Sequence, residues 1–209
     1  MFANLPLSEI ALVLVCMLIA LSLHEAMHAF AAHALGDTTA KEEGRLTINP
    51  VAHVDLYMTI LLPLVLMLLH LPPFFVAKPV PFNPNRVRYD EFGAALVALA
   101  GPFTNLGLAI ASALLLRLGG MSLGHDIVHL LAVFTQVNIL FFVFNMIPFP
   151  PLDGSRLLYA VAPEPVQRLM YQIEAMGFTA ILVFVLLLFP FISPIVSNTA
   201  EAIYSFLVL

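Results

Sequence analysis

Two histidines and a glutamate in the first long apolar segment have the spacing of a metal-dependent hydrolytic site. In His24-Glu25-Ala26-Met27-His28 the imidazoles are four residues apart, so in a helix they lie on one face and can bind the same ion. Glu25 then lies beside that ion, where a carboxylate can act as general base toward water. Packing histidines with a buried, protonated Glu25 are the structural alternative. Polar groups are costly inside a membrane segment, so the motif favours a functional zinc site.

A third protein ligand is needed, because a catalytic zinc site usually has three protein ligands and one open position. Asp153 is the leading candidate, since it closes a proline-rich stretch that follows an apolar segment. Pro148, Pro150 and Pro151 end the preceding helix and impose an extended path that could return Asp153 toward the histidines. Glu174, at the start of another apolar helix, is the weaker alternative.

The composition indicates a membrane protein built from several helices. Of the 209 residues, 61% are hydrophobic and only 10% are charged, which lies well outside the range of soluble domains. The apolar stretches are continuous rather than alternating, which argues against a transmembrane barrel. The formal charge of −5 and the lack of a basic patch argue against nucleic acid as a partner.

The elements that must position these residues are predicted as apolar spans. About 20 helical residues cross the hydrocarbon core. Five segments are long enough to span or nearly span it, roughly 8–34, 91–117, 127–148, 169–189 and 191–208. We therefore expect an all-α polytopic membrane protein with about five to six transmembrane helices.

Two further segments have less regular patterns. Segment 56–77 is apolar but contains Pro63, Pro72 and Pro73, so we expect a bent, re-entrant hairpin rather than a straight span. In segment 44–50 polar and apolar residues alternate before an Asn-Pro pair, which predicts a short β element near the cytosolic face.

The position of the candidate ligands restricts the topology. The histidines lie toward the C-terminal end of span 8–34, and Asp153 follows the C-terminal end of span 127–148, so both spans must run in the same direction for the ligands to meet. Loops 36–55 and 78–90 then share a side with the site. Every Lys and Arg except Arg117 falls on that side. The positive-inside rule therefore predicts a site facing the cytosol and an N-terminus outside.

Three motifs together resemble the site-2 protease family of intramembrane zinc metalloproteases. They are the His24–His28 motif, the stretch from Asn145 to Gly154, and Ala100-Gly101-Pro102-Phe103-Thr104-Asn105. Residues 44–50 followed by His53-Val54-Asp55 look like the compact bacterial and archaeal branch without PDZ or CBS domains. The resemblance covers most of residues 20–156 and implies a location in a prokaryotic cell membrane.

The resemblance also implies roles for individual residues. His24, His28 and Asp153 would bind one zinc ion per chain, and Glu25 would be the catalytic base. Asn145 would contact the substrate or the developing oxyanion.

Further residues have implied supporting roles. Asn105 would support the site by hydrogen bonds between helices. Apart from the resemblance, His53 is either a residue that lines or supports the site or binds substrate, or a loop histidine at the interface. Thr47 and Asn49, in the expected β element, would supply an edge to which an extended substrate pairs.

The combined prediction is a single membrane-embedded protease domain over 1–209, with a catalytic core at about 8–156 and additional helices at about 169–208. It would cut the membrane-spanning segments of other proteins in the lipid bilayer. Asp37 and Asp90 fall in loops, so an aspartyl intramembrane protease fits poorly. A non-proteolytic zinc scaffold or a metal transporter is the remaining alternative. Transport would favour ionisable residues spread across several spans.

Overall fold

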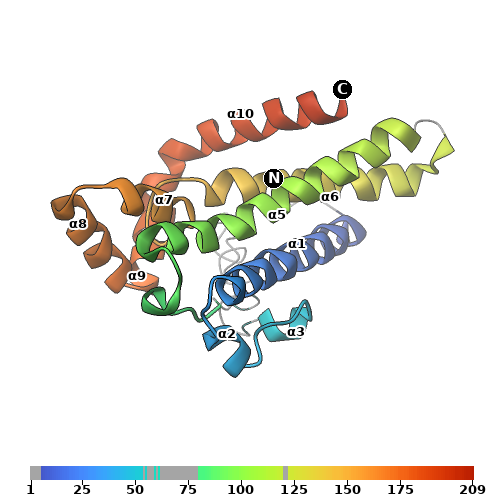
Figure 1. The fold of residues 1–209 in the computed structure, drawn as a ribbon. Helices are drawn as coiled ribbons and strands as arrows, with labels where there is room; N and C mark the ends of the chain where they lie inside the picture. The colour runs from blue at the N-terminus through green and yellow to red at the C-terminus, as the bar shows by residue number, and fades with distance from the viewer. Residues whose placement is uncertain (1–5, 54, 56–58, 60, 62–79, 120–121) are drawn as a thin grey trace.

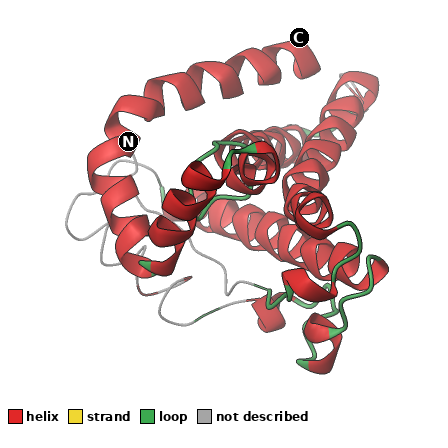
Figure 2. Ribbon diagram, turned by 60° about the vertical axis from the view of Figure 1, so that its left-hand side comes forward, coloured by secondary structure: helices red, strands yellow, loops and turns green. Residues whose placement is uncertain are grey.

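All of the regular secondary structure in the described part of the chain is helical (Figures 1 and 2). The structure is a computed structural model, and it describes residues 6–53, 55, 59, 61, 80–119 and 122–209. Within these ranges four helical runs are long and apolar enough to cross a membrane: Leu7–Ala34, Asp90–Gly119, His125–Asn145 and Thr179–Val208. The prediction of an all-α polytopic membrane protein is therefore confirmed.

Three long helices form the centre of the molecule: α1 (Leu7–Ala34), α5 (Asp90–Gly119) and α6 (His125–Asn145). Each of them packs against the other two, and α5 runs antiparallel to α1 and α6 (Figure 1). A hydrogen bond between His129 Nε2 and Glu9 Oε2, at 2.8 Å, joins the N-terminal ends of α1 and α6. These two helices therefore run in the same direction, as the expected meeting of ligands requires.

Small residues allow α1 to approach its neighbours closely. Cys16 and Ala20 are buried against Val133 and Val137 of α6. Near the C-terminal end of α1, Ala32 is buried against Val97 of α5. Close approach between helix backbones is how membrane helices gain packing contacts in the absence of a hydrophobic driving force. The close packing places the motif histidines of α1 directly against α5.

Two connecting segments lie together at the C-terminal end of α1. The first contains the short helices α2 (Thr39–Glu42) and α3 (Pro50–His53), and the second contains the 3-10 turn η3 (Pro84–Arg86). The Arg88 N–H donates to the Leu35 carbonyl at 2.9 Å. The Asn83 N–H donates to the Asp37 carboxylate at 2.6 Å. This end of the helical core is therefore tied down by hydrogen bonds that link residues far apart in sequence.

The predicted β element over 44–50 is not formed. Residues 43–49 form turns and irregular backbone, and α3 begins at Pro50. The Thr47 hydroxyl accepts a hydrogen bond from the Asn49 N–H, and the Asn49 side chain accepts one from the Val51 N–H. Such local side-chain bonds offer the backbone an alternative to pairing with another strand, so a period of two over a few residues was a weak predictor.

The C-terminal region differs from the two spans predicted at 169–189 and 191–208. It consists of five consecutive helical elements: α7 (Gly154–Val161), α8 (Glu164–Ala175), α9 (Phe178–Val183), the π-helical segment η5 (Phe184–Leu188) and α10 (Phe189–Val208). Gly177, at a φ of 55°, ends α8 and separates it from the membrane-length run that follows. The boundary falls here because glycine adopts this conformation without steric strain. This region therefore supplies one candidate span instead of two.

The last helix, α10, covers one side of the helical core. The chain bends between α9 and α10, and α10 then packs along α6 and α5 on the side away from α1 (Figures 1 and 2). Ala200 of α10 is buried against Ala109 and Ile139. The predicted re-entrant hairpin over 56–77 lies outside the described residues, apart from positions 59 and 61.

Candidate metal centre and active site

Three predicted ligand residues converge on one point between α1 and the turn after α6. His24 Nε2 and His28 Nε2 lie 3.0 Å apart. Asp153 Oδ2 lies 3.1 Å from His24 Nε2 and 3.4 Å from His28 Nε2. Both histidines are buried, at 3% and 9% exposure. The structure thus brings together side chains that are more than a hundred residues apart in sequence.

The helical period of α1 and the anchoring of the turn explain this convergence. His24 and His28 are one turn apart on α1, so their rings lie on one face. Helix α6 ends at Asn145, and the chain then turns through two backbone hydrogen bonds, from Phe149 to Ile147 and from Leu152 to Phe149. Leu152 is buried in a cluster with aromatic and aliphatic side chains of η5. Its burial fixes the position of Asp153, the next residue.

The separations between the three donor atoms fit a zinc ion. Two ligand atoms at 2.0–2.1 Å from a tetrahedral zinc lie about 3.3 Å from each other, close to the observed 3.0, 3.1 and 3.4 Å. Burial by itself raises the pKa of Asp153, but the neighbouring rings of His28 and His24 outweigh it and hold this pKa below its usual range. A metal ion binds the ionised form of a carboxyl group, so a lowered pKa is the direction that metal binding requires.

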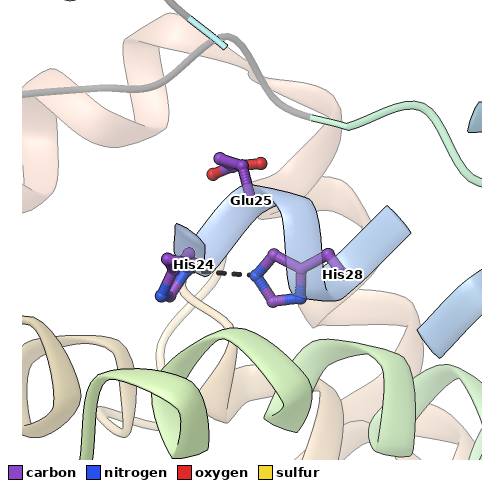
Figure 3. A group of neighbouring side chains, drawn as sticks. All are labelled: His24, Glu25 and His28. Carbon is purple, nitrogen blue, oxygen red and sulfur yellow. Dashed lines mark hydrogen bonds between the residues drawn. The ribbon is translucent and has the colours of Figure 1, made fainter. Parts of the chain in front are cut away.

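One stripe of α5 supports both imidazoles. Val97, Gly101 and Asn105 are spaced four residues apart and so share a helix face. The Val97 carbonyl oxygen lies 2.8 Å from His28 Nδ1, and Asn105 Oδ1 lies 2.6 Å from His24 Nδ1. In Figure 3 both rings point toward the α5 ribbon. Hydrogen bonds at Nδ1 hold each ring so that its Nε2 faces the other ring and Asp153.

Gly101 makes this close approach possible. A Cβ at Gly101 would lie 2.4 Å from His28 Nε2 and 2.7 Å from His24 Cε1, well inside van der Waals contact. Any side chain at this position would displace the rings from the positions that bring their Nε2 atoms together. The residue was part of the motif that carried the family resemblance, but its role became visible only from the packing of α5 on α1.

Glu25 lies beside the histidines but projects from the other side of the α1 ribbon (Figure 3). Potential ligand atoms of Glu25, His24 and His28 lie within 4.8 Å of one another. The Val80 N–H donates to Glu25 Oε2 at 3.2 Å. A carboxylate in this position can accept a proton from a water molecule next to the ion.

A cavity of about 630 Å³ opens beside these groups. Its walls come from α1, α5, α6, the 80–82 segment, the turn before α7, α7 itself and the α8–α10 region, and they are mainly aliphatic and aromatic. Glu25, Asn145 and Asp153 are among the polar groups that line it. Its size is within the range of sites that bind small ligands or short peptide segments.

Glu174, the weaker candidate for third ligand, forms a different contact. Its carboxylate pairs with Arg156, so the two residues connect α8 to α7. Both line the cavity, together with Ser155. The geometry therefore favours Asp153 over Glu174 as the acidic ligand.

Three predicted site residues lie away from this cavity. Thr47 and Asn49 form the local turn hydrogen bonds before α3, and His53 is buried with its Nε2 2.7 Å from the Thr47 carbonyl oxygen. None of them is among the described residues that line the cavity. In this structure His53 stabilises the loop that leads into α3, which packs against α1.

One polar residue near the site was missed in the sequence. Asn138 of α6 is fully buried, and its Oδ1 accepts a hydrogen bond from Asn105 Nδ2 at 2.9 Å. The signal that could have found it is its residue type, because a buried asparagine inside a membrane span is costly and needs a reason.

The fold and site define a polytopic membrane protein with a buried site of two histidines and one carboxylate beside a glutamate. Comparison with known proteins agrees with this class. The family described as Peptidase family M50 matches residues 117–189. No solved structure matches the chain.

Relatives that match the chain carry the name "Putative zinc metalloprotease". YwhC of Bacillus subtilis is 35% identical over 191 residues, which cover 87% of this chain and 83% of YwhC. Rip2 of Mycolicibacterium smegmatis is 31% identical over 198 residues, which cover 88% of this chain and 71% of Rip2. The chain belongs to peptidase family M50, which confirms the family expected from its motifs.

Proposed function

We propose that this protein is an intramembrane zinc metalloprotease that hydrolyses peptide bonds in the membrane-spanning segments of other proteins. The observation that carries the proposal is the meeting of His24 Nε2, His28 Nε2 and Asp153 Oδ2 within 3.0–3.4 Å of one another. Membership of peptidase family M50 and the four membrane-length helices support it.

His24, His28 and Asp153 would hold one zinc ion per chain. Bound there, zinc would polarise the scissile carbonyl and lower the pKa of water. Glu25 accepts the proton of the attacking water and delivers it to the leaving amine. The Val80 N–H donates to one oxygen of Glu25, which helps to fix the position of the carboxylate.

Asn145 is assigned to substrate binding. It lines the cavity, and one of its two N–H groups donates to the Phe141 carbonyl at 3.0 Å. That bond fixes the amide, so its second N–H can donate to the substrate carbonyl or to the oxyanion that develops from it. Thr47 and Asn49 have weaker support as a substrate edge, because their segment forms turns rather than a strand.

The apolar walls of the cavity support a substrate of matching character. Phe141, Phe144, Phe184 and Phe189 are among its lining residues. A stretch of an unwound transmembrane helix would present aliphatic and aromatic side chains to such walls, with the scissile bond next to Glu25. The single protease domain with its core at about 8–156 is part of the same proposal.

We further propose that the site faces the cytosol and that the N-terminus lies outside. The described cations Lys41, Arg45, Arg86, Arg88, Arg156 and Arg168 belong to the segments at the site end of the bundle. Arg117 lies near the opposite end, in the last turn of α5. The positive-inside rule supports the cytosolic side for the end that carries most of the cations.

The test compares wild type with Glu25→Gln and with Glu43→Gln, a matched change at an exposed residue outside the site. Each purified protein is assayed for zinc content and for cleavage of a panel of single-span membrane proteins in detergent. We expect equal zinc in all three and no cleavage by Glu25→Gln. Zinc binding without cleavage by wild type would favour a scaffold or transporter. Absence of zinc from wild type would overturn the proposal.

A further inference from the structure

A directional chain of hydrogen bonds runs through the interior of the helical core and ends at His24. The Asn138 Nδ2 donates to the Phe134 carbonyl at 2.8 Å, and Asn138 Oδ1 accepts from Asn105 Nδ2 at 2.9 Å. Asn105 Oδ1 then lies 2.6 Å from His24 Nδ1. Asn105 and Asn138 are both 0% exposed. This series of hydrogen bonds therefore links α1, α5 and α6 through side chains that are buried from solvent.

The donor and acceptor in each hydrogen bond follow from the first one, in which Asn138 donates to the Phe134 carbonyl. A backbone carbonyl can only accept, so Asn138 must present its N–H group to Phe134. Its oxygen then faces Asn105, which must in turn present its own N–H group. The Asn105 oxygen is left for His24, and an oxygen acceptor requires that His24 Nδ1 carries the proton. His24 Nε2 is then the unprotonated nitrogen, and it is the atom that faces Asp153 and His28.

The two histidines obtain this tautomer in different ways. His28 Nδ1 faces the backbone carbonyl of Val97, which cannot rotate. His24 depends on a side-chain amide, and an amide can turn over and exchange its oxygen for its nitrogen. If Asn105 turned over, an N–H group would face His24 Nδ1, and the ring proton would move to Nε2, where the metal binds.

We propose that Asn138 is a positioning residue that fixes the orientation of Asn105 and thereby the metal-binding tautomer of His24. A second bond, from Asn105 Nδ2 to the Ala20 carbonyl at 3.3 Å, acts in the same direction but is longer. The proposal rests on the assignment of His24 as a zinc ligand. It adds a function for a residue of α6 that does not itself touch the metal position.

The variant Asn138→Leu tests the proposal. Leucine has a branched side chain of similar size, but it cannot accept the hydrogen bond from the Asn105 amide. Thr135→Val is the matched control, because the Thr135 hydroxyl is also fully buried and also joins α6 to α5, through Ser112 at 2.7 Å. Both variants lose one interhelical hydrogen bond between the same two helices. Only Asn138 is connected to His24.

Zinc affinity is measured by competition with a chelator, and thermal unfolding is measured for the same samples. We expect both variants to unfold at a lower temperature than wild type. We expect Asn138→Leu alone to bind zinc about 10–100-fold more weakly, the range for loss of an outer partner of a ligand. Asn138→Asp should bind zinc more tightly than Asn138→Leu, because a buried, protonated carboxyl can donate to Phe134 and accept from Asn105.

Three outcomes separate the possibilities. Wild-type zinc affinity in Asn138→Leu would overturn the positioning role while leaving the protease proposal intact. An equal loss of affinity in Asn138→Leu and Thr135→Val would also overturn it, because the effect would then come from general loosening of the α5–α6 contact. Failure of wild type to bind zinc would instead remove the proposed function on which this inference rests.

Discussion

Asp153 Oδ2 lies 3.1 Å from His24 Nε2, across the contact between α1 and the turn that follows α6. This relationship places a carboxylate beside a pair of helical histidines, as the proposed three-ligand site requires. It depends on the parallel course of α1 and α6, and on the burial of Leu152, which holds the turn against η5. Both the acidic ligand and its distance from the histidines are therefore properties of the tertiary structure.

Removing the charge of Asp153 should weaken zinc binding more than removing that of Glu174. We expect Asp153→Asn to lower zinc affinity by more than the roughly 10–100-fold typical of losing an outer partner, because it changes a ligand itself. Glu174→Gln should leave zinc affinity unchanged, since its carboxylate pairs with Arg156. Chelator competition on both variants measures the difference. The reverse pattern would assign Glu174 as the ligand and exclude Asp153.

A methyl group at Gly101 should disrupt the site, because it would meet His28 Nε2 at 2.4 Å. We expect Gly101→Ala to lose zinc binding and to lower the free energy of unfolding by about 1–3 kcal/mol, as overpacking typically does. Gly107→Ala is the control on the same helix, since a Cβ there meets no atom within 4 Å among the described residues. It should be neutral or stabilising by up to about 1 kcal/mol. Zinc content and thermal unfolding distinguish the two variants.

Asp37 should make stability depend on pH. Burial by itself raises the pKa of Asp37, but hydrogen bonds from Thr39 and Asn83, with the charge of Arg86, outweigh it and lower this pKa. A lowered pKa in the folded state stabilises the protein at pH values above the unfolded-state pKa of about 3.9. This stabilisation is lost as the pH falls through the folded-state pKa.

Asp37→Asn therefore should destabilise the protein by about 1.5–3 kcal/mol at pH 7, the usual value for hydrogen bonds to a charged group. The difference from wild type should shrink as the pH is lowered below about 4. Thermal unfolding across this pH range measures it, with Asp126→Asn as a control at a fully exposed carboxylate. A difference that is constant with pH would contradict the prediction.

Single cysteines should report the orientation of the protein in the membrane. In a Cys16→Ala background, Lys41→Cys and Ser122→Cys place exposed thiols at opposite ends of the bundle. The native Cys16 is a buried free thiol, so its replacement by alanine removes background labelling. We expect a membrane-impermeant maleimide to label Ser122→Cys in intact cells and Lys41→Cys only after permeabilisation. The opposite pattern would place the site outside.

Several elements of the fold followed from local sequence, and others did not. The spans that became α1, α5 and α6 were predicted to within a few residues, because long apolar segments have few alternatives in a membrane. The prediction for 169–189 failed because Gly177 ends α8 before the last span begins. The prediction of a strand at 44–50 failed because Thr47 and Asn49 bond to nearby backbone N–H groups instead.

The sequence by itself determined the chemistry of α1. Four-residue spacing places His24 and His28 on one helix face whatever surrounds the helix, and Glu25 must then lie beside them. Tertiary structure decided which carboxylate lies beside the two histidines, why position 101 must lack a side chain, and which groups orient each imidazole. Those features depend on contacts between helices distant in sequence, and local spacing contains no information about which distant residue a side chain will meet.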